Sequence, residues 1–261
     1  MAIRELSDLA RGLALAVPFL SGIERVRPCP SGEYPFSLPW VQGLRLDFET
    51  RITVLVGENG SGKSTLMRTL AALCGLPTTG GSRNELGSDR GAHHRLGTLI
   101  DIVRPRFRER PRDAYYFTAE NAGDFAALLE ERREDPDFLG DPFAIHGGTS
   151  LLHRSHGESF FARMSRGMEG GLYLFDEPEA ALSPTSQLKF VRAIWQAVNH
   201  RRCQIILATH SPILLSTPGA TVIGMEDPQL RALNPRTTSH WAVTARVLSD
   251  PDWLKGIVGD Q

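Results

Sequence analysis

The residues best suited to chemistry form a glycine-rich stretch directly after an apolar run at 52–56. The stretch reads Gly57-Glu58-Asn59-Gly60-Ser61-Gly62-Lys63-Ser64-Thr65. Glycines let the backbone close around phosphate oxygens, and a helix that starts here points its free N–H groups at an anion. Lys63 is then expected to reach the β- and γ-phosphates of a nucleotide, and the Ser64 hydroxyl to ligate Mg²⁺. The spacing predicts a phosphate-binding P-loop between a strand and a helix from 64 to about 74.

Two adjacent carboxylates, Asp176 and Glu177, end a second apolar run at 172–175. Such a run predicts a parallel strand covered on both faces, whose end lies at a ligand crevice. Asp176 is expected to hold Mg²⁺ through water, and Glu177 to polarise an attacking water as a general base. Alone, the two acids would equally fit a strand that ends in solvent. Together with the P-loop, they predict nucleotide hydrolysis.

Two further segments could contact a bound phosphate. Ser155-His156-Gly157-Glu158 opens a helical stretch, where a hydroxyl and bare N–H groups favour an anion. The same spacing of serine and glutamate is also that of an N-terminal capping box. His210 follows an apolar run at 204–208. A lone histidine is more often a structural hydrogen bonder, but beside a nucleotide it can sense the γ-phosphate.

The rest of the sequence predicts the elements that position these residues. The 261-residue chain has a net charge of −1, which offers no global polycation for nucleic acid. Its three cysteines are widely separated and form no CxxC pair, which indicates a reducing cytoplasm. The apolar stretch at 12–20 is too short to span a bilayer. An amphipathic helix is expected near the N-terminus, because apolar residues recur there at helical spacing, at Leu6, Leu9, Leu13 and Val17.

The segment 76–112 has a different composition. A strand-like run at 98–103 precedes an arginine-rich stretch at 104–112. Arginine pairs well with phosphate, so this stretch could bind a polyanion, although a solvated loop is the commoner meaning of such a run. Earlier in the chain, Tyr34, Phe36 and Trp40 are candidates for an adenine contact, and each could instead anchor the core or a loop.

The motif order resembles that of the ATP-binding-cassette ATPases. P-loop, Ser-x-Gly-Glu, Asp-Glu-Pro-Glu and Thr-His-Ser-Pro follow one another over roughly residues 20–225. Within that group the chain is similar to small soluble bacterial ATPases near the RecF, SMC and OLD-type proteins. The resemblance implies an α/β P-loop NTPase fold: a mostly parallel sheet flanked by helices, an antiparallel β portion near the N-terminus, and a helical lobe before Asp176.

The resemblance also implies a single domain over residues 1–261. The nucleotide-binding core would comprise about 20–75 and 172–225. The helical signature lobe would cover about 120–170, and a C-terminal extension would follow at 226–261.

An ATP-sandwich homodimer is a further implication of the resemblance. Ser155, Gly157 and Glu158 of one subunit would close on the γ-phosphate held by the other. Glu177 would be the catalytic carboxylate and His210 the switch histidine. The expected cofactors are ATP and Mg²⁺. The nucleotide ligands from the P-loop would be Asn59, Gly60, Ser61, Gly62, Lys63, Ser64 and Thr65. The metal ligands would be Ser64, Asp176 and Glu120. Glu120 would take the place of the usual Q-loop glutamine.

These features together predict a cytoplasmic ATPase that dimerises on ATP and is coupled to DNA maintenance or to defence against foreign DNA. Two alternatives stay open: the nucleotide-binding subunit of a membrane transporter, and an ATP-gated scaffold for a partner enzyme. Glu158 and the segment 179–184 weakly favour the first reading over transport. Glu177 counts against a scaffold, which could dispense with that carboxylate. The partner, DNA or protein, is not specified by the sequence.

Overall fold

The computed structural model describes residues 18–30, 32–82, 99–118 and 168–258. The amphipathic helix expected near the N-terminus, Glu120, and the segment with Ser155, Gly157 and Glu158 lie outside these ranges. Across the described ranges, none of the helices combines the length and apolar character needed to cross a membrane.

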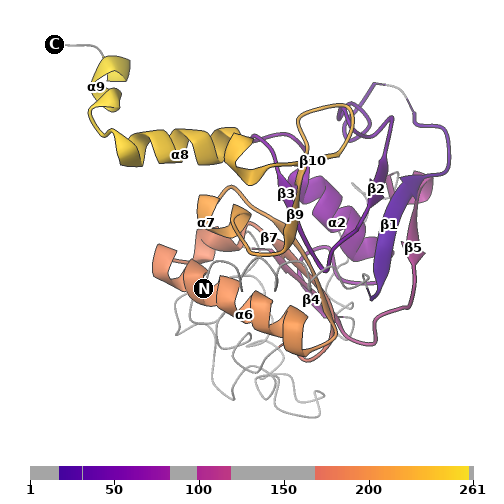
Figure 1. The fold of residues 1–261 in the computed structure, drawn as a ribbon. Helices are drawn as coiled ribbons and strands as arrows, with labels where there is room; N and C mark the ends of the chain where they lie inside the picture. The colour runs from indigo at the N-terminus through magenta and orange to yellow at the C-terminus, as the bar shows by residue number, and fades with distance from the viewer. Residues whose placement is uncertain (1–17, 31, 83–98, 119–167, 259–261) are drawn as a thin grey trace, which may run out of the picture.

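A seven-stranded sheet forms the centre of the molecule (Figure 1). Its strands are β3 (Ile52–Val56), β4 (Gly81–Ser82), β6 (Ala114–Thr118), β7 (Gly171–Asp176), β8 (Cys203–Ala208), β9 (Ala220–Gly224) and β10 (Arg231–Leu233). Their order across the sheet is β10-β9-β3-β8-β7-β6-β4, and only the two edge strands β10 and β4 pair antiparallel. Because β3, β8 and β7 are parallel neighbours, the residues that follow them meet at one edge of the sheet.

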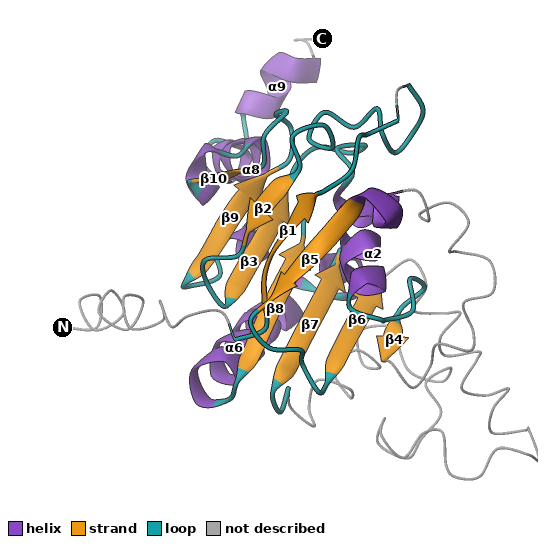
Figure 2. Ribbon diagram, turned by 90° about the vertical axis from the view of Figure 1, so that its right-hand side faces the viewer, coloured by secondary structure: helices purple, strands orange, loops and turns teal. Residues whose placement is uncertain are grey.

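A second, antiparallel sheet lies in front of the first (Figure 2). It contains β1 (Leu20–Arg25), β2 (Arg45–Asp47) and β5 (Val103–Phe107), in the order β2-β1-β5. The fully buried Gln204 on β8 joins the two sheets, because its amide accepts from Leu20 N at 2.9 Å and donates to Leu20 O at 2.7 Å. The first strand is thereby fixed against the central sheet.

Two helices enclose the central sheet in apolar layers. Helix α2 (Lys63–Leu73) and the antiparallel sheet pack on one face, and α6 (Pro184–His200) packs on the other. Ser183 caps α6 by accepting from Ser186 N, as its position before Pro184 predicts. These layers include Leu66, Leu70, Leu174 and Ile206 on the first face, and Val54, Phe175, Phe190 and Ile194 on the second.

The remaining described elements are short or peripheral. They are the 3-10 helices η3 (Pro178–Ala181) and η4 (Pro235–Thr237), and the α-helices α7 (Pro212–Leu215), α8 (Ser239–Ser249) and α9 (Trp253–Val258). Helices α8 and α9 contain no buried residue, and they extend away from the sheets (Figure 1).

The described architecture confirms the predicted α/β fold, with a mostly parallel sheet and an antiparallel portion built largely from the N-terminal part. The strand predicted at 98–103 is wrong, because residues 99–102 are helical and β5 begins at Val103. Leu99 and Ile102 are both buried, and their spacing of three residues places them on one helix face. The predicted helical lobe before Asp176 falls within 119–167, outside the described residues.

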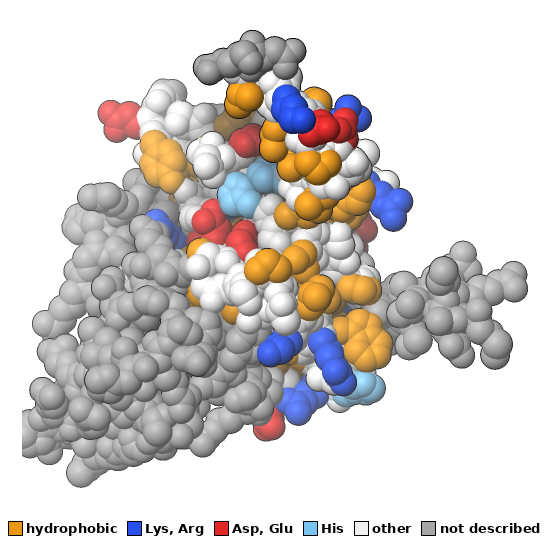
Figure 3. Space-filling view, turned by 90° about the vertical axis from the view of Figure 1, so that its left-hand side faces the viewer, with side chains coloured by type: hydrophobic (Ala, Val, Ile, Leu, Met, Phe, Trp, Pro, Cys, Tyr) orange, Lys and Arg blue, Asp and Glu red, His pale blue; other side chains and the backbone are white. Residues whose placement is uncertain are grey.

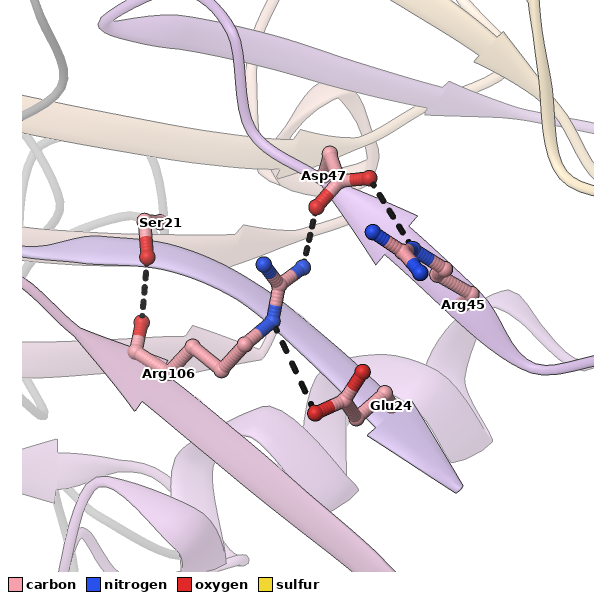
Figure 4. Close-up of polar contacts among 5 residues, drawn as sticks. All are labelled: Ser21, Glu24, Arg45, Asp47 and Arg106. Atoms are coloured by element: carbon pink, nitrogen blue, oxygen red, sulfur yellow. Dashed lines mark hydrogen bonds and ion pairs between the residues drawn. The ribbon is translucent and has the colours of Figure 1, made fainter. Parts of the chain in front are cut away.

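The arginine-rich stretch at 104–112 is partly engaged inside the protein. Arg106 on β5 forms an ion pair with Asp47 on β2, and its Nε lies 4.0 Å from Glu24 Oε1 (Figure 4). A Cβ at Gly22 on β1 would collide with this guanidinium, so the glycine allows the arginine to cross the strand. Arg106 therefore joins three strands, and it is not a free cation for a polyanion.

Candidate functional site

The glycine-rich stretch forms a tight loop between β3 and α2. Gly60 and Gly62 adopt φ values of 83° and 90°, in the left-handed region that favours glycine. A Cβ at Gly62 would lie 2.7 Å from Leu38 Cδ1 and 3.0 Å from Trp40 Cζ2. No side chain caps the start of α2. The first N–H groups of this helix therefore have no side-chain acceptor, as a loop that binds phosphate requires.

Lys63 is buried at the start of α2, with 4% of its surface exposed. Its Nζ donates to Gly57 O at 2.8 Å and to Glu58 O at 3.2 Å. Burial lowers the pKa of Lys63, and the nearby carboxylates of Glu177 and Asp176 oppose that shift. The loop's own carbonyls therefore hold the ammonium in place, facing the acids at the ends of neighbouring strands.

Asp176 ends β7 and is only 3% exposed. Burial raises its pKa to about 6, although hydrogen bonds from Ser64 and Tyr116 oppose the rise. Tyr116 donates to Oδ2 at 3.2 Å, while Oδ1 is buried and has no hydrogen-bond partner among the described residues.

This arrangement fits Mg²⁺. The ion prefers oxygen ligands, and it commonly takes one or two carboxylates together with substrate phosphates and water. The unpaired Oδ1 of Asp176 and the hydroxyl of Ser64 supply such oxygens. Within the described ranges, no cluster of three or more His, Cys, Asp or Glu side chains could hold a metal by itself. The described residues thus offer one carboxylate and one hydroxyl to a metal.

Glu177 turns away from Asp176 although the two are adjacent. It has a φ of 49°, and it is the one non-glycine residue with positive φ in the part of the chain that the structure describes. Its N–H donates to Ala208 O at 2.9 Å, which holds the turn against β8. The left-handed conformation places Glu177 Oε1 3.3 Å from His210 Nε2. Strained backbone of this kind concentrates at functional sites.

His210 follows β8 and is held at both its backbone and its ring. Its backbone N–H donates to Glu179 Oε1 at 2.6 Å, and its Nδ1 lies 2.7 Å from His240 Nε2. Burial lowers the pKa of His210, and the positive charge of Lys63 adds to the shift. A neutral ring is thus favoured at this position.

Polar atoms without partners gather at this site. Among the described residues, seven buried side-chain nitrogen or oxygen atoms make no hydrogen bond. Four of them belong to Ser61, Asp176, Glu179 and His210. Buried polar groups are normally paired, so this concentration beside the α2 N-terminus and Lys63 marks a place for a polar, anionic ligand. Histidine and acidic side chains lie side by side in the middle of one molecular face (Figure 3).

The aromatic segment before β2 supports the loop. Trp40 is fully buried and donates from Nε1 to Ser61 O at 2.7 Å, and Phe36 is also buried. Both are therefore anchors of the core. Tyr34 is 63% exposed, and its hydroxyl hydrogen-bonds the Thr65 hydroxyl. It is the one of the three predicted aromatics that is available to a ligand.

The structure thus brings most of the predicted residues together. Glu120, Ser155, Gly157 and Glu158 lie outside the described residues. Sequence reasoning missed Ser239 and His240, the first two residues of α8, because no motif spacing marks them. The predicted residues that meet at the carboxyl edge of β3, β7 and β8 are Asn59, Gly60, Ser61, Gly62, Lys63, Ser64, Thr65, Asp176, Glu177 and His210.

Comparison with known proteins gives family matches over the same motifs. A family model described as "AAA domain" matches residues 36–121, and one described as "AAA domain, putative AbiEii toxin, Type IV TA system" matches residues 151–216. The cytochrome c biogenesis ATP-binding export protein of Rhodospirillum rubrum is 31% identical over 186 residues, which cover 66% of this chain and 73% of that protein. The petrobactin import ATP-binding protein of Bacillus anthracis is 23% identical, over 69% of this chain and 70% of that protein.

Other similar proteins are much longer or more distant. ATP-binding cassette sub-family A member 7 of Mus musculus is 30% identical over 76% of this chain, but the chain spans only 9% of that protein. Among solved structures, cbiO1 from Clostridium perfringens, part of the ABC transporter complex cbiONQ, superposes with a TM-score of 0.47 at 15% identity, covering 91% of this chain and 97% of that one.

Proposed function

The chain belongs to the ATP-binding-cassette P-loop ATPases, and from this premise we propose that it hydrolyses ATP with Mg²⁺ in a sandwich between two copies of the chain. One observation carries the proposal. The partnerless atoms Asp176 Oδ1 and His210 Nε2 lie beside Lys63 and the uncapped start of α2. Positive charge, free N–H groups and unpaired carboxylate oxygen are what a nucleotide with its metal would satisfy.

Each residue has a role in this proposal. Lys63 leaves the carbonyls of Gly57 and Glu58 to bind the β- and γ-phosphates. Ser64 and Asp176 hold Mg²⁺, which neutralises charge on the phosphates when bound. Glu177 orients and deprotonates the attacking water, and His210 donates from Nε2 to the γ-phosphate. Tyr34 is the proposed stacking partner of the adenine.

The second half of the sandwich would come from the other copy. Ser155, Gly157 and Glu158 of the partner are proposed to close on the γ-phosphate, and Glu120 to face the metal. We further propose that residues 1–261 form one domain, with the core at about 20–75 and 172–225, the signature lobe at about 120–170 and the C-terminal extension at 226–261.

We propose that the energy of ATP hydrolysis drives transport. The named relatives include an export and an import ATP-binding protein, each covered for most of its length by this chain. Their names support the role of an energy subunit that docks onto a separate membrane protein. The engagement of Arg106 and of Arg202, which donates to Glu109 Oε2 at 2.6 Å, leaves fewer free cations for the DNA-linked role.

A second candidate is defence against foreign DNA. It is favoured by the description of the family model that matches residues 151–216, which names a toxin of a toxin–antitoxin system. This role requires the same ATPase chemistry, so the two candidates differ in the partner that changes the rate of hydrolysis.

Steady-state ATP hydrolysis tests the proposal. Wild type should turn over ATP only with Mg²⁺. Glu177→Gln should bind ATP, lose turnover and accumulate a dimer in size-exclusion chromatography, whereas Lys63→Ala should not bind ATP. Lys189→Ala, at an exposed position on α6, is the matched control and should behave as wild type. Rapid turnover by Glu177→Gln would show that another base activates the water.

The partner is tested in the same assay. Addition of single- or double-stranded DNA at low salt, where phosphate contacts are least screened, should leave the rate unchanged if the chain serves a transporter. Stimulation by DNA that Glu177→Gln abolishes would favour the defence role. Wild-type ATP affinity in Lys63→Ala would refute the P-loop assignment itself.

A further inference from the structure

The first turn of α8 reaches back from the C-terminal extension to the nucleotide site. Ser239 Oγ donates to Glu58 Oε1 on the P-loop at 2.7 Å. His240 Nε2 lies 2.7 Å from His210 Nδ1 at the end of β8, and the two rings are 4.7 Å apart between centroids. Neither α8 nor α9 contains a buried residue. The side-chain contacts of Ser239 and His240 therefore help to attach α8 to the site.

The two nitrogens of the His210 ring are in different situations. Nδ1 is engaged by His240, whereas Nε2 is buried and makes no hydrogen bond in the described part of the chain. Glu177 Oε1 lies 3.3 Å from Nε2. The ring is therefore anchored through one nitrogen, and the other faces the acids and Lys63 in the site.

The hydrogen-bond acceptors around His210 determine which of its two ring nitrogens carries the proton. Glu177 and a phosphate both offer acceptor oxygens on the Nε2 side, so Nε2 must carry hydrogen to bind them. In a neutral imidazole, Nδ1 is then an acceptor. His240 must consequently donate from Nε2 to His210 Nδ1. This assigns one tautomer to each ring.

The surroundings of His210 favour this neutral, fixed ring. In the described part of the chain, the charged and titratable groups that act on the ring include Lys63, Glu177, Glu179 and His240. Burial together with the charge of Lys63 lowers the pKa of His210. Glu179 already holds the backbone N–H at 2.6 Å. With the backbone held, rotation of the ring about its side-chain bonds is the freedom that His240 removes.

We propose that His240 is a positioning residue of the ATPase site: it donates to His210 Nδ1 and thereby keeps His210 Nε2–H directed at the terminal phosphate. The inference rests on the proposed function for its effect on hydrolysis. The tautomer of His210 can be read without any turnover. Replacing a residue that holds a site residue in place, one contact away from the reacting groups, typically lowers activity about 10- to 100-fold.

Turnover measures the effect on hydrolysis. His240→Ala is expected to lower kcat by about 10- to 100-fold with little change in KM for ATP, because the ring is misdirected while the P-loop is intact. His240→Gln should recover most of kcat, since its amide N–H can donate from a similar reach. His200→Ala, in the last turn of α6, is the matched control and should leave kcat unchanged. Wild-type kcat in His240→Ala would overturn the proposal.

Imidazole ¹⁵N spectra of the nucleotide-free full chain separate the two proposals. In wild type and His240→Gln, His210 should be mainly in the Nε2–H tautomer, and in His240→Ala this bias should be lost. An identical His210 spectrum in His240→Ala would overturn the positioning role. Absence of hydrolysis in wild type would refute the ATPase proposal alone, and the spectra would still decide on His240.

Discussion

Replacing Asp176 with asparagine is expected to stabilise the protein without nucleotide. Burial raises the pKa of this carboxyl from 3.8 to about 6, so the native state binds its proton more tightly than the unfolded chain does. Between these two pKa values, stability therefore falls as the pH rises, and above pH 6 the whole cost is present. A shift of this size corresponds to about 3 kcal/mol at 1.36 kcal/mol per unit. An uncharged side chain avoids that cost.

Urea unfolding of wild type and Asp176→Asn measures this cost. At pH 7.5 the variant should be more stable by about 2 to 3 kcal/mol. At pH 5 the difference should fall to roughly half, because Asp176 is then mostly protonated in the native state while the unfolded chain is still mostly ionised. Mg²⁺ with ATP should raise the midpoint of wild type and should have much less effect on the variant.

A second carboxyl provides the control. A hydrogen bond from Arg106 lowers the pKa of Asp47, so Asp47→Asn should give no gain in stability at pH 7.5. A variant at Asp176 that is no more stable than wild type at pH 7.5, or a difference that does not change with pH, would refute the reasoning. Either result would mean that burial of the charge at Asp176 is fully compensated.

Two substitutions test the scaffold and the loop. Gln204→Ala removes both partners of the Leu20 backbone and should lower the free energy of unfolding by about 3 kcal/mol in urea titrations, and an unchanged midpoint would contradict the bridging role. Gly62→Ala places a side chain on a left-handed backbone, which costs about 1 to 2 kcal/mol, and brings its Cβ against Leu38. ATP affinity in a titration should therefore fall at least about tenfold. Gly256→Ala, which has open space around its Cβ, is the control and should bind ATP as wild type does.

The chain's local features were predictable from sequence because they depend on neighbouring residues. A β-branched run followed by glycines and Lys63 gives β3, the loop and α2 with nearly the predicted bounds. Ser183 before Pro184 gives the start of α6 by the same local logic. The apolar run that ends at Asp176 likewise predicts β7 and the location of the acids.

Contacts across the fold could not be read in that way. The strand predicted at 98–103 was wrong because burial at Leu99 and Ile102 follows a helix face that only packing on the core reveals. From the sequence, the stretch that contains Arg106 was expected to bind a polyanion or to form a solvated loop. Arg106 instead pairs with Asp47, because β5 and β2 flank the same strand.

The sequence by itself determined which chemical groups this protein carries and the strand ends that present them. Only the tertiary structure decided that Glu177 Oε1 lies beside Nε2 of His210. The same is true of His240, thirty residues further along the chain, which contacts Nδ1 of that ring. The physical reason is that residue types and short spacings specify local backbone geometry. The meeting of distant side chains depends on the order of the strands and on where α8 begins, and no periodicity in the sequence records either.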